Sequence, residues 1–169
     1  LLAGYGSRLS RGDIPHKSLL PFGDETLLSR HLSCLDSLSV SCVYLVVGHN
    51  KEDVKQYVKG LSLGLEYNFI DNDVYRTTGN TLSMIMGLRY CREDVIILDG
   101  DVLYPPSEFC KYVKNAEPTS FALIPADVND TESTKTLVRS DGKIEMFVTK
   151  RDLTLEEKAN FCFSVEAIG

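Results

Sequence analysis

The 169-residue sequence contains no tryptophan and three histidines, and its five cysteines show neither a C-x-x-C pair nor zinc-binding spacing with the histidines. The spacing therefore argues against a zinc-finger site and against a C-x-x-C redox motif. We expect reduced, mostly buried thiols, as is usual in a cytoplasmic protein. These cysteines are Cys34, Cys42, Cys91, Cys110 and Cys162.

Long apolar runs are also missing. No segment reaches the roughly 18 apolar residues that a membrane span needs, and the opening "LLAGYGSR" is too short and too soon charged for a signal peptide. The chain starts without methionine and ends on the apolar run "VEAIG". We therefore expect one domain over residues 1–169 that is incomplete at both termini, with no membrane partner.

The charge balance is acidic, with 18 Lys and Arg against 24 Asp and Glu, a net charge of −6. This balance argues against a general nucleic-acid-binding surface. An anionic substrate would need a local cluster of cations, helped by a metal ion.

Short apolar runs alternate with helical patterns along the first three quarters of the chain. We predict buried strands at 43–47, 66–70, 94–101 and 120–124, and helices at 24–38, 52–60, 80–91 and 107–116. Strands about 25 residues apart favour parallel pairing through right-handed crossovers. The predicted fold class is α/β, a doubly wound and mostly parallel Rossmann-like sheet.

Side-chain spacing supports these helices. Asp24 is the predicted cap of the first helix, whose apolar stripe is Leu28, Leu32 and Leu35. Asn80 is the predicted N-cap of the helix at 80–91, which places Leu82, Ile85 and Met86 on one face. Residues 135–150 contain Asp141-Gly142 between two runs, which predicts an added antiparallel β-hairpin.

The opening loop is rich in glycine and cations. A Rossmann fingerprint needs a third glycine where Leu9 stands, and a P-loop needs Gly-Lys-Ser/Thr, so neither pattern fits. A purely structural turn would account for the glycines but not for the nearby Arg8 and Lys17. A phosphate cradle explains both, because Gly4 and Gly6 let backbone N–H groups approach phosphate oxygens while the cations supply charge.

Two later segments fit the same chemistry. Asp99 and Asp101 follow a predicted buried strand, at the strand end where open α/β sheets place ligands, and paired carboxylates suit Mg²⁺. Gly79 and Asn80 begin a predicted helix, where Asn80 can cap the helix, read a base edge, or do both.

These segments together resemble the nucleotidyltransferases that activate sugar phosphates and phosphocholine. "LLAGYGSRL" is similar to the opening L-A-A-G-x-G-x-R, with Leu2 in place of the first alanine, and "PHKSLLPF" is similar to the P-K segment, with His16 inserted before the lysine. "TTGNTLS", "ILDGD", the hairpin lysines and "FSVEAIG" follow in the family's order.

The resemblance implies a set of site residues. The catalytic residues are Arg8, Lys17 and Asp101, of which Asp101 binds Mg²⁺ with Asp99 in support. The nucleotide-binding residues are Leu2, Ala3, Gly4, Gly6, Ser7, Gly79, Asn80 and Ser83. The acceptor-binding residues are Lys135, Lys150 and Glu166. The family's second metal-binding aspartate would lie beyond residue 169.

The resemblance also implies a reaction that joins an NTP to a phosphorylated small molecule and releases pyrophosphate. The "TTGNTLS" segment favours CTP, and the acceptor is phosphocholine, inositol phosphate, aminoethylphosphonate or a sugar 1-phosphate. For choline, Tyr75 and Tyr104 are candidates for an aromatic cage. A non-catalytic nucleotide-sensing or scaffold homologue and a molybdenum-cofactor guanylyltransferase-like enzyme stay open as alternatives, as does a homodimer.

Overall fold

The computed structural model describes residues 1–6, 16–117, 119–125, 127, 129, 134–149, 151–160 and 163–165. The chain divides into two compact units, Leu1–Ala116 and Glu117–Gly169. The division falls just after the last predicted helix of the α/β part. Each unit is described below by itself.

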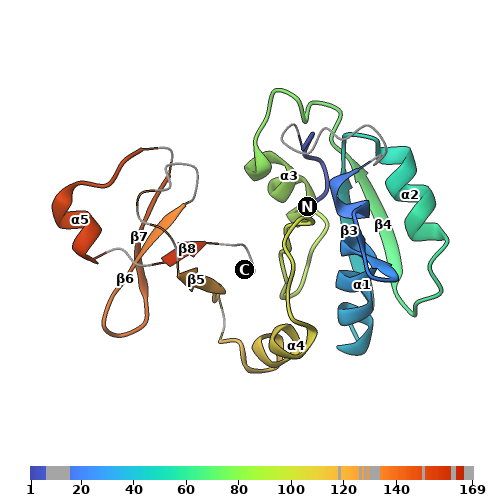
Figure 1. The fold of residues 1–169 in the computed structure, drawn as a ribbon. Coiled ribbons are helices and arrows are strands. Elements are labelled where there is room, and N and C mark those ends of the chain that lie inside the picture. The colour runs from blue at the N-terminus through green and yellow to red at the C-terminus, as the bar shows by residue number, and fades with distance from the viewer. Residues whose placement is uncertain are drawn as a thin grey trace. The chain divides into compact units, whose positions relative to one another are not determined.

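A short parallel sheet forms the centre of the first unit (Figure 1). β3 (Cys42–Val47) pairs in parallel with β4 (Glu66–Asp71), with Leu45 opposite Phe69 in the register. Leu2 forms a parallel bridge to Val47 on the other edge of β3. Apolar β-branched residues suit this place because both sides of the sheet are covered, and Val46 and Val47 are buried.

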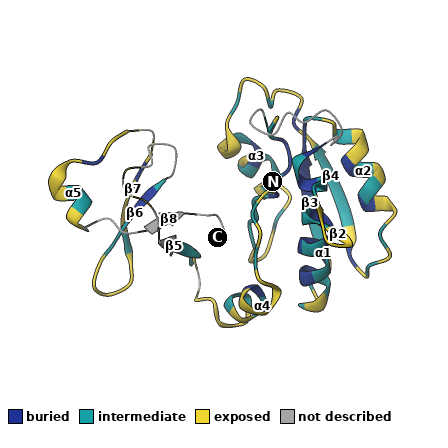
Figure 2. Ribbon diagram, viewed as in Figure 1, coloured by how far each residue is buried: buried dark blue, intermediate teal, exposed yellow. Residues whose placement is uncertain are grey.

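Four helices follow the predicted order: α1 (Leu27–Ser37), α2 (Lys51–Lys59), α3 (Asn80–Leu88) and α4 (Pro106–Asn115). In Figure 1 the β3–β4 pair lies between α3 and α2. α1 buries its predicted leucine stripe and α2 buries Val54 and Val58, as the dark blue segments of Figure 2 show. The α/β class with a parallel pair and an antiparallel hairpin is confirmed.

Two predicted helix caps are wrong by one or two residues. α1 is capped by Thr26 instead of Asp24, because Thr26 Oγ1 accepts from Ser29 N while Ser29 Oγ accepts from Thr26 N, a reciprocal capping box. α3 is preceded by Gly79 as its N-cap, so Asn80 is the first helical residue and does not cap. The observed N-cap residues, Thr26 and Gly79, both have the extended backbone that is typical of this position.

The buried face of α3 also differs from the prediction. Ser83 is buried, whereas Ile85 is 42% exposed. A Cβ added to Gly87 would lie 3.3 Å from Val46 Cγ2, so α3 approaches β3 closely at this glycine. Of the predicted apolar face, Leu82 and Met86 are half-buried and Ile85 is exposed, so that face is not the one most deeply buried.

The predicted strand at 94–101 is extended chain without a strand ladder. Its backbone meets the N-terminal segment at two points, where Leu1 N donates to Leu98 O and Gly100 N donates to Leu1 O at 3.1 Å. Upstream of Leu98, residues 94–98 and β3 line the two sides of a groove of about 600 Å³. A strand needs a hydrogen-bonded neighbour along its length, and residues 94–97 form no strand ladder in the structure.

Small elements complete the first unit. The 3₁₀ helix η2 (Lys17–Leu19) leads into a two-residue hairpin of β1 (Pro21–Phe22) and β2 (Glu25–Thr26), which the sequence pattern does not predict. The four cysteines among the described residues are free, and Cys34 alone of these four is buried. No helix among the described residues is long and apolar enough to cross a membrane.

The second unit is a four-stranded antiparallel sheet in the order β5-β8-β6-β7. β6 (Lys135–Val138) and β7 (Ile144–Val148) form the predicted hairpin, and Gly142 has the positive φ of 81° that its turn requires. β8 (Phe163–Val165) pairs with β6 and β5 (Leu123–Pro125) pairs with β8, and α5 is Leu155–Asn160. The predicted strand at 120–124 is therefore shorter and begins later.

Candidate functional site

The N-terminal segment reaches the carboxyl end of β3 along the edge of the sheet. Leu2 N donates to Val46 O at 2.8 Å, and Ala3 O accepts from His49 N at 3.3 Å. Both residues are buried, Leu2 at 2% exposed and Ala3 at 5%. The chain then leaves the sheet as the turn that contains Gly4 and Gly6.

Lys17 lies beside both glycines of this turn. A Cβ added to Gly4 would lie 3.4 Å from Lys17 Nζ, and one added to Gly6 would lie 3.4 Å from Lys17 Cδ. Gly6 also has a φ of +63°, which side chains rarely allow. The Lys17 side chain therefore lies along the glycine turn, where a phosphate cradle needs a cation.

Asp101 meets the same lysine. Lys17 Nζ forms an ion pair with Asp101 Oδ2, although the two residues are 84 positions apart in the chain. The Asp101 side chain is 42% exposed, so its carboxylate reaches solvent. Three predicted components, the glycine turn, Lys17 and Asp101, thus lie together at the end of the sheet.

Neighbouring groups hold Asp101 in place. A Cβ added to Gly100 would lie 2.1 Å from Leu2 Cδ2, so the residue before Asp101 packs directly on the N-terminal segment. On the other side, His31 Nε2 donates to Val102 O at 2.6 Å. Burial lowers the pKa of His31, which keeps its ring neutral. The backbone on both sides of Asp101 is therefore fixed.

Asp99 and Asp101 supply the hard oxygen atoms that Mg²⁺ prefers. Burial raises the pKa of Asp99, and the like charge of Asp101 raises it further. A cation between the two carboxylates would favour their charged forms. No group of three or more Asp, Glu, His or Cys that could hold a metal occurs among the residues that the structure describes. The donors present fit an ion that takes its remaining ligands from substrate phosphates and water.

His16, the residue inserted before the lysine, is a core residue. It is 2% exposed, and its Nδ1 accepts from Ser18 N at 3.2 Å as the cap of η2. Burial is the largest cause that lowers its pKa, to about 4. A neutral, buried His16 therefore anchors the backbone from which Lys17 extends.

The loop at 72–79 follows β4 and ends at the start of α3. Asn72 is 1% exposed and bonded at three atoms: its N donates to Val47 O, its Nδ2 donates to Ser83 Oγ at 3.0 Å, and its Oδ1 accepts from Val74 N at 3.1 Å. Ser83 is 3% exposed. The Asn72–Ser83 hydrogen bond thus joins the two ends of the loop.

Gly79 and Asn80 are exposed at the N-terminus of α3. Gly79 has a φ of −89° and a ψ of −179°, and nothing lies within 4 Å of a Cβ placed there. No side chain caps this helix. Leu82 N donates to Gly79 O at 3.3 Å, which leaves the N–H groups of Asn80 and Thr81 and the Asn80 amide available to a ligand.

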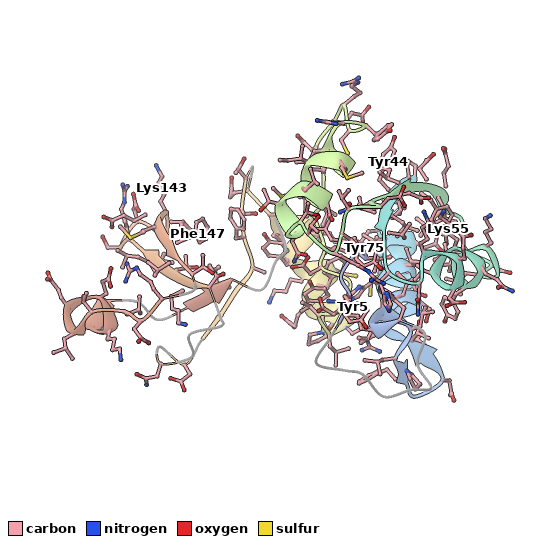
Figure 3. All side chains as sticks on the ribbon, turned by 90° about the horizontal axis from the view of Figure 1, so that it is seen from above. Tyr5, Tyr44, Lys55, Tyr75, Lys143 and Phe147 are labelled. Carbon is pink, nitrogen blue, oxygen red and sulfur yellow. The ribbon has the colours of Figure 1, made fainter. Side chains whose placement is uncertain are left out.

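An aromatic and cationic cluster, which the sequence analysis did not predict as a unit, joins this loop to the glycine turn. The Tyr5 and His49 rings contact edge to face at 4.5 Å between centroids, and the His49 and Tyr75 rings lie at 6.0 Å. The Arg76 guanidinium lies over both tyrosine rings. We call Tyr5, His49, Tyr75 and Arg76 the Tyr5–Arg76 cluster (Figure 3 labels Tyr5 and Tyr75).

One signal in the sequence could have pointed to this cluster. His49 directly follows Gly48 at the carboxyl end of β3, where ligands of open α/β sheets gather. Tyr104, the other predicted cage residue, stacks on Phe109 and lies 5.1 Å from the His31 ring. Its ring contacts are thus with α1 and α4.

The remaining predicted residues lie elsewhere or outside the described part. Lys135 is in β6 of the second unit and is 2% exposed. Ser7, Arg8, Lys150 and Glu166 lie outside the described residues. The 600 Å³ groove between β3 and residues 94–98 is apolar along most of its walls, so it does not suit a polyanion.

Comparison with known proteins agrees with this geometry. Residues 1–143 match the MobA-like NTP transferase domain. The chain belongs to this family. It is 33% identical over 108 residues to the CMP-5'-(3-aminopropyl)phosphonate synthase of Streptomyces rubellomurinus, covering 63% of this chain and 17% of that protein.

Other relatives match along the whole chain. It is 29% identical over 181 residues to the bifunctional protein GlmU of a Synechococcus species, covering 100% of this chain and 39% of that protein. The chain thus spans well under half the length of these two relatives.

Solved structures show the same fold. The inositol-1-phosphate CTP transferase from T. maritima superposes with a TM-score of 0.67 at 23% identity, covering 97% of this chain and 67% of that one. The CTP:phosphocholine cytidylyltransferase from Streptococcus pneumoniae superposes with a TM-score of 0.70 at 16% identity, covering 99% of this chain and 66% of that one. The Rossmann-like nucleotidyltransferase fold follows from these likenesses.

Proposed function

We propose that this chain is the nucleotide-binding part of a Mg²⁺-dependent nucleotidyltransferase that joins CTP to a phosphorylated small molecule and releases pyrophosphate. The observation that carries the proposal is the meeting of the Gly4–Gly6 turn, Lys17 and Asp101 at the end of a parallel sheet. A triphosphate needs backbone donors and a cation, and a bound Mg²⁺ needs a carboxylate.

The reaction is an in-line displacement. An oxygen of the acceptor's phosphate attacks the α-phosphorus of the NTP, the bond from that phosphorus to the α–β bridging oxygen breaks, and pyrophosphate leaves. The second pKa of a phosphate monoester is about 6, so the attacking oxygen is already anionic at neutral pH and needs no general base. Catalysis then consists of positioning and charge neutralisation.

Each predicted residue has a role in that scheme. The glycine turn and Arg8 hold the β- and γ-phosphates, with Ser7 beside them, and Lys17 stabilises negative charge on the transferring phosphoryl group. Asp101, supported by Asp99, would hold Mg²⁺, which lowers the charge repulsion between the two phosphates when it is bound. In the absence of substrate, the ion pair between Lys17 and Asp101 keeps the lysine beside the glycine turn.

The base is placed between the N-terminal segment and the start of α3. Leu2 and Ala3, both buried, would pack below the base, while the start of α3 at Gly79 and Asn80 would offer N–H groups and an amide to its edge. Cytosine and uracil exchange a donor and an acceptor at the exocyclic position, and one unpaired buried group costs about 1–3 kcal/mol. Three of the similar proteins have CMP or CTP in their names, which supports cytosine, whereas the name of the GlmU relative contains neither.

The acceptor is a phosphate monoester or phosphonate, as in the names of the same relatives. Lys135, Lys150 and Glu166 are its proposed ligands, all from the second part of the chain. Ser83, in contrast, acts on the nucleotide through the loop at 72–79, because its hydroxyl is already bonded to Asn72.

Pyrophosphate release from ATP, CTP, GTP and UTP tests the proposal, with Mg²⁺ and a panel of phosphocholine, inositol 1-phosphate, 2-aminoethylphosphonate and glucose 1-phosphate. We expect release with one acceptor class and a preference for CTP over UTP of at least about tenfold in kcat/KM. Asn80→Ala should reduce that ratio, and Arg92→Ala, an exposed residue outside the loop, should not.

Three other outcomes would contradict parts of the proposal. A preference for GTP would favour the guanylyltransferase alternative and contradict the choice of CTP. Release from no NTP, together with retained NTP binding, would favour a nucleotide-sensing homologue. Absence of both binding and release would contradict the nucleotidyltransferase assignment itself.

A further inference from the structure

Arg76 is an exposed cation that neighbouring groups hold in one position. Its Nε donates to Tyr75 Oη at 3.1 Å, and its Cζ lies 5.7 Å from the Tyr75 ring centroid and 5.8 Å from that of Tyr5. A long arginine side chain loses conformational entropy when it is fixed. Cation–π contacts with two rings and a hydrogen bond offset that cost.

The loop that carries Arg76 is fixed at its start and its end. The Asn72–Ser83 hydrogen bond joins its two ends to each other. Lys51 of α2 forms ion pairs with Asp71 at 2.9 Å and with Asp73 at 2.7 Å, which ties the start of the loop to the neighbouring helix. Arg76 is therefore presented by a braced loop, and its position is set before any ligand arrives.

The contacts of Arg76 leave its phosphate-binding edge open. The guanidinium uses Nε for Tyr75, and no ion pair joins Arg76 to a carboxylate among the described residues. The two terminal nitrogens are the pair that binds a phosphate through parallel hydrogen bonds. Lys17, which also lies at this turn, is in contrast paired with Asp101.

Tyr5 connects this arginine to the predicted phosphate cradle. Tyr5 stands between Gly4 and Gly6, so the ring under the guanidinium belongs to the turn itself. Its other neighbour is His49 at the end of β3. The Tyr5–Arg76 cluster thus places a guanidinium at the glycine turn from a segment about 70 residues later in the chain.

From this geometry we infer that Arg76 binds a substrate phosphate beside the Gly4–Gly6 turn. The inference rests on the proposed function and adds a cation that the sequence motifs do not include. The phosphate belongs either to the nucleotide or to the acceptor, and the chemistry at Arg76 is the same for both. Tyr75 and Tyr5 are positioning residues, because they hold the guanidinium.

Calorimetric titration tests the inference, using wild type, Arg76→Gln, Arg76→Lys and the matched control Arg89→Gln. Arg89 is an exposed arginine at the other end of α3, so its variant has the same change of charge. The probes are pyrophosphate, cytidine, CMP, CDP and CTP, each with Mg²⁺, and KM for the acceptor is measured alongside. Melting temperatures are recorded for every variant.

We expect Arg76→Gln to weaken binding of at least one phosphate-bearing probe by about tenfold or more, with Arg76→Lys in between. Cytidine binding and the melting temperature should stay as in the control. Weaker binding of pyrophosphate, CDP and CTP by Arg76→Gln would mean that Arg76 binds a phosphate of the nucleotide. A raised KM for the acceptor, with unchanged binding of these probes, would mean that Arg76 binds the phosphate of the acceptor. Either result supports the inference.

The inference would be overturned if Arg76→Gln and Arg89→Gln bound every phosphate-bearing probe equally well and had the same KM for the acceptor. Failure of the proposed function is a separate outcome. Wild-type protein that releases pyrophosphate from no NTP, yet binds pyrophosphate in an Arg76-dependent way, would contradict the reaction and leave the phosphate site in place.

Discussion

Lys17 owes its position to the buried residue before it. His16 caps η2 through Ser18 N, so the lysine leaves the backbone at a fixed point and reaches along the glycine turn to Asp101. The inserted histidine therefore keeps the lysine at the site. A charged imidazolium in this place would be buried beside Lys17, which costs free energy.

We predict that His16 makes the protein less stable in acid. Its pKa is lowered from 6.5 to about 4 by burial, so between these values the unfolded chain binds a proton that the folded chain does not. Stability from this residue is complete above pH 6.5 and is lost as pH falls toward 4. From about pH 7.5 to about pH 5 the loss is about 2 kcal/mol.

Urea unfolding at both pH values measures this loss. The control is His16→Asn, which keeps an acceptor for Ser18 N and does not titrate. The variant should lose about 2 kcal/mol less than wild type over the same interval, because other groups such as His31 contribute equally to both proteins. The same loss in both proteins would mean that His16 is protonated in the folded state.

Among the elements, the loop at 72–79 depends on one buried hydrogen bond. Asn72 and Ser83 are both buried, and Asn72 Nδ2 donates to Ser83 Oγ. If the serine is removed, the Asn72 amide keeps its burial and loses its acceptor. An unpaired buried donor costs more than the hydrogen bond contributes when it is formed.

We predict that Ser83→Ala lowers the free energy of unfolding by about 1–3 kcal/mol. Thr77→Ala is the control, because Thr77 is exposed and its Oγ1 donates to Val74 O within the same loop. That change should stay within about 0.5 kcal/mol of wild type. Equal effects in urea unfolding would show that the Asn72–Ser83 bond does not brace the loop.

A second element, the turn at 99–101, depends on a glycine. We predict that Gly100→Ala destabilises by about 1–3 kcal/mol, because its Cβ would lie 2.1 Å from Leu2 Cδ2 and 3.0 Å from Leu1 O. Gly79→Ala is the contrast, since nothing lies within 4 Å of that Cβ and its φ is −89°.

Thermal melts of the two variants check this contrast. Gly79→Ala should melt close to the wild-type temperature, because alanine restricts the unfolded chain without a steric clash, which offsets its poorer suitability for an N-cap. Gly100→Ala should melt well below it. A wild-type melting temperature for Gly100→Ala would contradict the close packing of this turn on the N-terminal segment.

Most elements were predictable because their signals are local. The β-branched run of β3 and the spacing of Val54 and Val58 in α2 need no knowledge of the rest of the chain. The buried face of α3 was not predictable, because it depends on how closely Gly87 approaches Val46. The prediction of a strand at residues 94–98 was wrong for a similar reason, because a strand needs a hydrogen-bonded neighbour, which its own sequence does not determine.

For the whole molecule, the charge distribution matters more than the net charge. The net charge of the chain is −6, yet the cations Lys17 and Arg76 both reach the glycine turn, from separate segments. Motif spacing predicted Lys17 and Asp101 separately, and they meet because Gly100 packs on the N-terminal segment that leads into the glycine turn. The position of Arg76 could not be predicted, because its contacts with Tyr5 and Tyr75 exist only in the folded chain.

The central claim is that Asp101 and its neighbours form the site of nucleotidyl transfer, and the rate of pyrophosphate release tests it most directly. The protein is assayed with saturating CTP, Mg²⁺ and acceptor, comparing Asp101→Asn with Asp53→Asn, an exposed aspartate in the first turn of α2. We predict a loss of about 100-fold or more for Asp101→Asn, with an unchanged melting temperature, and wild-type rates for Asp53→Asn. Equal rates for the two variants would contradict the claim.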